Sequence, residues 1–203
     1  MSICVFGDSI AWGAYDPTHG GWVTLLRNHI EREWEKFNNI SLYNLGINGD
    51  TSSGVLTRLH NEISTHSVYG LQGIIYAVGV NDSAKRQETG DNWVPYNVFQ
   101  KNIQSLHLQG LSYTDKIMFI GLTSVVDSLL APYPGDPDKT YTQTSVDRYD
   151  QVIREYCRLH KVAYVPLPNI NLCNDGLHPN TQGHQKIFEL VRPIVEQMLT
   201  SGA

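Results

Sequence analysis

The stretch SICVFGDS at residues 2–9 begins as an apolar run and ends in a turn. The run from Ser2 to Phe6 is about as long as a strand that is buried on both faces, and Gly7 and Asp8 are typical turn residues. Ser9 therefore stands where a strand passes into the next element. Side chains at the carboxyl ends of strands in an α/β sheet lie at the edge where ligands bind, so this turn can present a nucleophile.

Four further apolar runs follow, and stretches of helical period separate them. The expected strands are Ser2 to Phe6, Ile40 to Leu45, Gly73 to Val78, Lys116 to Leu122 and Val162 to Leu167. Apolar residues at helical spacing outline helices from Trp22 to Phe37, Val55 to Ile63, Tyr149 to Tyr156 and Ile187 to Met198, the last with a kink or restart at Pro193, and a further helix is expected within Val94 to Leu108. Ser83 to Trp93 and Ser124 to Thr144 lack a period and are predicted to be loops. The alternation predicts an α/β fold, a doubly wound three-layer sandwich around a parallel sheet.

Composition narrows the classes of function. The chain has 203 residues, of which 41% are hydrophobic, and this predicts one domain over residues 1–203. A charged fraction of 17% and a net charge of -5 provide no basic surface, so nucleic-acid binding is disfavoured. No window approaches the roughly 18 apolar residues of a membrane span. The N-terminus lacks the basic start of a secretory signal, and the sequence predicts a cytoplasmic protein without stable membrane insertion.

Polar residues follow the predicted strands at the same edge of the sheet. Gly46 follows the second strand and could present a bare N–H, and Asn81 follows the third with a neutral amide donor. Asp175 and His178 stand in the turn-rich segment NDGLHPN after the fifth strand. A carboxylate three residues before a histidine can reach its ring and fix the tautomer, which leaves the other nitrogen free to act on Ser9.

Each of these residues also has a plainer interpretation. Ser9 and Gly46 are common turn residues, and the Asn81-Asp82 pair is a frequent helix cap. The Asp175-x-x-His178 spacing also suits metal ligation or hydrogen bonding within a loop. No HExxH or paired CxxC motif is present in the sequence, so a catalytic zinc is not expected.

Taken together, the blocks resemble the SGNH (GDSL-type) hydrolase superfamily. The four blocks are Gly7-Asp8-Ser9, Gly46 within NLGINGDTS, Asn81 within GVND, and DGLHPN at residues 175–180. The resemblance implies a flavodoxin-like fold with five parallel strands. It also implies that Ser9 is the nucleophile, that His178 is its base and Asp175 orients the base, and that the Ser9 N–H, Gly46 and Asn81 form an oxyanion hole. No metal or organic cofactor is implied.

The resemblance predicts hydrolysis of a small-molecule carboxylic ester, with short acyl chains or O-acetyl groups favoured. Ile10 stands where the name-giving motif has Leu, and Val80 where Thr often precedes the Asn; both departures concern substrate preference. The expected substrate contacts are Asp8, Ile10, Ile47, Val80 and Leu177. The alternatives are acyl transfer through the same acyl-enzyme, metal-dependent phosphoester hydrolysis that would use Asp8, Asp82, Asp175 and His178, and a non-catalytic carbohydrate-binding domain.

Overall fold

A parallel sheet of five strands forms the centre of the protein. The computed structural model describes residues 1–37 and 39–200. In the sheet the strands lie in the order β2-β1-β3-β5-β7. Their bounds are Ser2–Gly7 (β1), Ser41–Gly46 (β2), Leu71–Ala77 (β3), Ile117–Ile120 (β5) and Ala163–Val165 (β7). All five predicted strands are present, and their order is that of a flavodoxin-like doubly wound fold, so the predicted fold class is confirmed.

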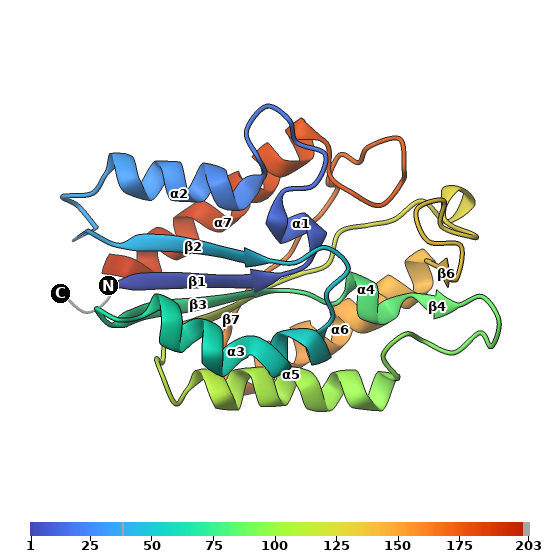
Figure 1. The fold of residues 1–203 in the computed structure, drawn as a ribbon, viewed down its shortest axis with the longest axis horizontal. Helices are drawn as coiled ribbons and strands as arrows, with labels where there is room; N and C mark the ends of the chain where they lie inside the picture. The colour runs from blue at the N-terminus through green and yellow to red at the C-terminus, as the bar shows by residue number, and fades with distance from the viewer. Residues whose placement is uncertain (38, 201–203) are drawn as a thin grey trace.

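The alternation of side chains along β1 divides the core into two layers. Ile3 and Val5 belong to one buried cluster, and Cys4 and Phe6 belong to the other, because successive residues of a strand point to opposite faces. Helices α2 (Trp22–Arg32) and α7 (Thr181–Thr200) cover the first face. Helices α3 (Ser52–His66), α5 (Tyr96–Gly110) and α6 (Gln143–His160) cover the second (Figure 1). The sheet is thus enclosed between two layers of helices.

Two helices differ from the sequence-based expectation. Helix α2 ends at Arg32 because Glu33 leaves the helical region with ψ of 34°, although Phe37 remains buried beyond the helix end. Helix α7 runs through Pro193 without the predicted restart. A helix tolerates proline when its neighbours compensate for the missing N–H. Among the described residues, no helix is both long and apolar enough to cross a bilayer.

The two segments that were predicted to be loops contain short strands that pair with each other. Strands β4 (Lys85–Arg86) and β6 (Lys139–Thr140) form a two-stranded antiparallel sheet, and a 3₁₀ turn, η1, spans Asp127–Leu129. Trp93 lies between two cations of this sheet, with the Arg86 guanidinium 4.1 Å and the Lys139 ammonium 4.5 Å from its ring centre. Both segments were predicted to be loops without strands; each instead contains a two-residue strand, and the two strands hold the segments together.

The strand ends are level at one edge of the sheet. Gly7 of β1 is in register with Gly46 of β2 and with Ala77 of β3. The short helices α1 (Ser9–Trp12) and α4 (Val80–Ser83) come next after β1 and β3. They lie with β4 and β6 at this carboxyl edge, while the N-terminus lies at the opposite end of the sheet (Figure 1). The sequence-predicted site residues follow these strand ends.

Candidate active site

Ser9 and His178 meet although they are 169 positions apart in the chain. The Ser9 Oγ and the His178 Nε2 are 2.9 Å apart, within ordinary hydrogen-bond distance. Ser9 is the first residue of α1, where the backbone N–H has no acceptor within the helix. Asp8 caps this helix, since its Oδ1 accepts the Ile10 N–H at 2.9 Å. The tight turn after β1 thus fixes the serine at the carboxyl edge.

Asp175 holds both the ring and the backbone of His178. Its Oδ2 lies 2.5 Å from the His178 Nδ1, and its Oδ1 accepts the N–H groups of Leu177 at 3.0 Å and His178 at 3.1 Å. Burial alone would raise the pKa of Asp175, but these hydrogen bonds outweigh burial and leave its pKa below the ordinary value. The carboxylate therefore stays ionised, and it orients the ring so that Nε2 faces Ser9.

Tyr15 covers the outer side of the His178 ring, a contact that the sequence reasoning missed. The two ring centres are 4.9 Å apart, and Tyr15 has the unusual φ of 62°. The segment that carries Tyr15 is fixed by the buried Asp16, whose carboxylate accepts the Gly21 N–H at 3.1 Å and the Thr181 hydroxyl at 2.9 Å. The hydrogen bond from Thr181 to Asp16 joins the loop after α1 to the start of α7.

Asn81 is buried beside Ser9, and its amide is bonded at both ends. Its Nδ2 donates to the Asp50 carbonyl at 3.1 Å, and its Oδ1 accepts the Tyr141 hydroxyl at 2.9 Å. The neighbouring Asp82 does act at a helix end, but at that of α3, where its carboxylate accepts the Ser52 N–H at 3.0 and 3.1 Å. Asn81 thus remains the polar side chain of α4 that faces the site.

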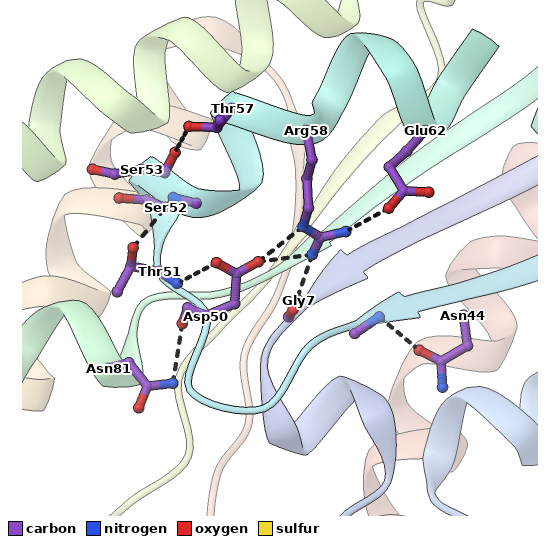
Figure 2. A network of polar contacts seen from close by, with 12 residues as sticks. Gly7, Asn44, Asp50, Thr51, Ser52, Ser53, Thr57, Arg58, Glu62 and Asn81 are labelled. Atoms are coloured by element: carbon purple, nitrogen blue, oxygen red, sulfur yellow. Dashed lines mark hydrogen bonds and ion pairs between the residues drawn. The ribbon is translucent and has the colours of Figure 1, made fainter. Parts of the chain in front are cut away.

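Gly46 is the last residue of β2 and Gly49 follows it; of these two glycines, the structure places Gly49, and not Gly46, at the site. The Gly46 N–H is donated to the Asn44 Oδ1 at 3.0 Å (Figure 2). A Cβ on Gly46 would meet the backbone of Trp12, so this glycine serves the close packing of α1 on β2. Gly49 has φ of 76°, and nothing lies within 4 Å of the place of its missing Cβ. The expectation that Gly46 presents its N–H to the site is therefore wrong.

Asp50 is the centre of the polar network that shapes the segment after β2 (Figure 2). Its Oδ2 accepts the Arg58 Nε at 3.0 Å and Nη2 at 2.8 Å, and its Oδ1 accepts the Thr51 N–H at 2.9 Å. The same Arg58 Nη2 lies 3.4 Å from the Gly7 carbonyl oxygen. Two guanidinium N–H groups that converge on one carboxylate oxygen form strong charge-assisted hydrogen bonds, so Arg58 fixes the segment that carries Gly49 relative to β1.

These side chains open into a pocket of about 300 Å³. Ser9, Asn81 and His178 line the pocket with polar groups, and Leu177 lines it with an apolar side chain. The other lining residues are Ala14, Tyr15, Asn48, Gly49, Tyr133, Gly135, Asp136, Lys139 and Tyr141. The strand β6 and the chain around it therefore form the far side of the pocket.

Comparison with known proteins identifies the family. The family model of the GDSL-like lipases/acylhydrolases matches residues 5–186. The chain belongs to this GDSL-like family. No curated protein matches the chain.

Solved structures with the same fold are similar to this GDSL-like chain over almost its whole length. A lipase/acylhydrolase from Enterococcus faecalis is 22% identical with a TM-score of 0.73, and covers 96% of this chain and 95% of its own. An acetylxylan esterase from Geobacillus stearothermophilus is 16% identical with a TM-score of 0.71, covering 98% and 94%. TesA is 20% identical with a TM-score of 0.70, covering 98% and 99%. At these identities the likeness concerns the fold.

Only one of the five expected substrate contacts lines the pocket of this GDSL-like protein. Leu177 does so, whereas Ile10 and Val80 are 8% and 3% exposed and pack into the core beneath the site. Asp8 is buried beside them, around a separate cavity of about 20 Å³. Ile47 is exposed but is not part of the pocket wall. The four residues other than Leu177 were predicted from their adjacency in sequence to site residues, and they lie outside the wall of this pocket.

Among the described residues of this acylhydrolase-family chain, no three His, Cys, Asp or Glu side chains come together so that they could hold a metal ion. The residues of the metal-dependent alternative are engaged in other hydrogen bonds. Asp175 is bonded to His178, Asp82 to Ser52, and Asp8 to the start of α1. The chemistry that this site offers is that of a serine, an imidazole and a carboxylate in line.

Asp8 is a buried carboxyl group with one unpaired oxygen. Its Oδ2 has no hydrogen-bond partner in the part of the chain that the structure describes. Burial, opposed by the hydrogen bond from the Ile10 N–H, raises the pKa of Asp8 from 3.8 to about 7, and the nearby carboxylates of Asp82 and Asp50 add to this. Folding therefore favours the protonated form of Asp8.

Asp8→Asn is expected to flatten the pH dependence of stability between about pH 4 and 7. In that window the folded protein keeps a proton that the unfolded chain releases, so the free energy of unfolding falls as pH rises. One such group contributes a slope of at most about 1.4 kcal/mol per pH unit. Urea unfolding of Asp8→Asn and of the unmodified protein at a series of pH values measures this slope. Asp82, whose pKa burial raises to about 6, accounts for the slope that remains; an unchanged slope in Asp8→Asn would show that Asp8 does not titrate there.

Proposed function

We propose that the protein is a serine esterase that hydrolyses carboxylic esters through an acyl-enzyme on Ser9. The observation that carries this proposal is the line of contacts from Ser9 Oγ to His178 Nε2 at 2.9 Å and from His178 Nδ1 to Asp175 Oδ2 at 2.5 Å. This line opens into the pocket beside Asn81. Membership of the GDSL-like lipase/acylhydrolase family supports the same reaction class.

In the proposed reaction, Ser9 Oγ attacks the ester carbonyl carbon while its proton passes to His178 Nε2. The carbonyl oxygen becomes an oxyanion, which accepts hydrogen bonds from the Ser9 N–H, the Gly49 N–H and the Asn81 Nδ2. The intermediate collapses, and His178 protonates the departing alcohol. Water then gives a proton to His178 and attacks the acyl-enzyme, which releases the acid and restores Ser9.

Gly49 replaces Gly46 in this assignment for a structural reason. The Gly46 N–H is already bound by Asn44, whereas the Gly49 N–H has no hydrogen-bond acceptor among the described residues. Gly49 also lines the pocket together with Ser9 and Asn81. Three donors on one side of the nucleophile fit the tetrahedral intermediate of acyl transfer to water.

The pocket favours an ester with a short acyl group and a polar alcohol part. A volume of about 300 Å³ is at the small end for ligand pockets. Its outer wall carries the rings of Tyr15 and Tyr133 and the ion pair between Lys139 and Asp136, which are 3.1 Å apart. Aromatic rings beside polar groups suit an acetylated carbohydrate, in agreement with the acetylxylan esterases of the same fold. We propose O-acetyl esters of this kind as the substrate class.

The proposal is tested by treating the protein with a fluorophosphonate and measuring its intact mass. We expect one adduct, located on Ser9 by peptide mapping, with parallel loss of p-nitrophenyl acetate hydrolysis. Ser9→Ala should take up no adduct, and a chelator should leave the activity of the untreated protein unchanged. Labelling at another residue, or activity that a chelator abolishes, would overturn the proposal.

A further inference from the structure

The amide of Asn81 can take only one orientation. The Asp50 carbonyl oxygen is an acceptor without a proton, so the group that lies 3.1 Å from it must be the donating Nδ2. The Oδ1 then faces the Tyr141 hydroxyl at 2.9 Å and accepts its proton. The reverse orientation would place two carbonyl oxygens against each other. An amide nitrogen has two hydrogens, so one N–H of Asn81 remains for the pocket that this residue lines.

Tyr141 is a buried residue whose hydroxyl donates to Asn81 and whose position is fixed by its surroundings. Its side chain is 1% exposed, and burial raises the pKa of its hydroxyl well above the ordinary value, to which the carboxyl of Asp8 also contributes. The hydroxyl is therefore protonated at neutral pH and can donate to Asn81 Oδ1. The Tyr141 N–H is donated to the Leu130 carbonyl at 3.1 Å, and its ring meets the edge of Tyr133 at 5.7 Å. The residue follows β6 directly, so the braced pair β4–β6 fixes its position.

We propose that Tyr141 is a positioning residue that acts through Asn81. Its hydroxyl fixes the amide with an N–H toward the oxyanion site, and by donating to Oδ1 it polarises the amide and strengthens that N–H as a donor. The inference rests on the proposed function, in which Asn81 stabilises the oxyanion. Through Tyr141, the segment of residues 124–142 before α6 would then contribute to the reaction step as well as to the pocket wall.

Tyr141→Phe is expected to lower kcat for p-nitrophenyl acetate about tenfold and to change KM by less than about twofold. The oxyanion exists only in the transition state and the intermediate, so an interaction that serves it affects kcat and not ground-state binding. Rates should be referred to the active-site concentration from fluorophosphonate titration, so that an unfolded fraction does not contribute. An unchanged kcat would overturn the inference.

Tyr149→Phe is the matched control. Tyr149 is fully buried, and its hydroxyl donates to a backbone carbonyl, that of Val94, at 2.6 Å. Removal of this hydroxyl costs a buried hydrogen bond in the same way but lies outside the pocket. We expect its kcat to stay within about twofold of the unmodified protein, with a Tm loss similar to that of Tyr141→Phe. An equal loss of kcat in both variants would mean that Tyr141 has a structural role only.

The double variant Asn81→Ala with Tyr141→Phe separates the inference from the proposed function. Asn81→Ala alone should lower kcat by about 10²-fold or more, as loss of one oxyanion donor does. In that background Tyr141→Phe should have no further effect, because its target is gone. A further tenfold loss there would show that Tyr141 does not act through Asn81. If Asn81→Ala leaves kcat unchanged, the oxyanion assignment fails and the inference fails with it, whereas a large Asn81→Ala effect without a Tyr141→Phe effect refutes the inference alone.

Discussion

Ser9→Ala is expected to reduce kcat for p-nitrophenyl acetate by about 10⁴-fold or more, to a level close to the background rate. Without the hydroxyl no acyl-enzyme can form, and only the oxyanion donors and substrate binding remain to assist attack by water. KM should change little, because the hydroxyl makes little contribution to ground-state binding. Initial rates at saturating substrate, measured with enough protein to detect a residual activity, give the ratio.

The fold should survive this change, so the loss can be assigned to chemistry. The Ser9 Oγ is bonded to His178 Nε2 at the pocket and fills no core position. We expect Tm to shift by no more than a few degrees, as for other exposed polar truncations. Ser112→Ala, at an exposed serine whose hydroxyl donates to the Gln109 carbonyl, is the control and should keep full activity. Undiminished turnover by Ser9→Ala would refute the nucleophile assignment.

Asp175→Asn is expected to lower kcat by about 10⁴-fold while leaving the geometry nearly unchanged. In the unmodified protein the Leu177 and His178 N–H groups donate to Asp175 Oδ1 at 3.0 and 3.1 Å. The oxygen of an asparagine at this position can still accept both hydrogen bonds. Its amide nitrogen then faces the His178 Nδ1 and favours the tautomer with the proton on Nε2. That tautomer donates to Ser9 and cannot take its proton, which is the cause of comparable losses in serine proteases.

The matched control for this variant is Asp150→Asn. Asp150 also accepts a backbone N–H, that of Leu122 at 2.8 Å, together with the Tyr164 hydroxyl, but it lies outside the pocket. We expect Asp150→Asn to lose stability and to keep kcat.

Because hydrogen bonds hold the pKa of Asp175 below its ordinary value, the stability that Asp175 contributes is present at neutral pH and is lost as pH falls. Asp175→Asn should therefore also weaken the loss of stability in acid; a kcat above about a tenth of normal would contradict the assigned role.

The residues that could be predicted from the sequence were those whose position follows from a strand. Ser9, Asn81 and the Asp175–His178 pair follow buried apolar runs, and the parallel sheet brings the ends of such runs together. The prediction for Gly46 was wrong because two glycines, Gly46 at the end of β2 and Gly49 beyond it, stand three residues apart. The choice between them depends on which N–H is already bonded, and that is decided by the local contact from Asn44 to Gly46, which has no periodic signal.

The contacts of Tyr15 with His178 and of Tyr141 with Asn81 could not be predicted for a different reason. Tyr15 reaches His178 from a loop with a left-handed backbone, and Tyr141 reaches Asn81 from a segment with several prolines. The strands that fix Tyr141, β4 and β6, have two residues each. A strand of that length shows no alternation, and its existence depends on a partner that lies far away in the sequence.

The distance of 169 positions between Ser9 and His178 has a consequence for the synthesis of the protein. The serine leaves the ribosome 169 positions before the histidine, so the proposed esterase activity requires a nascent chain that already includes His178. The last helix, α7, also closes one face of the sheet. The Ser9–His178 pair and the packing of α7 on the sheet can therefore form together once α7 has been made, and we expect the proposed esterase activity to appear with that step.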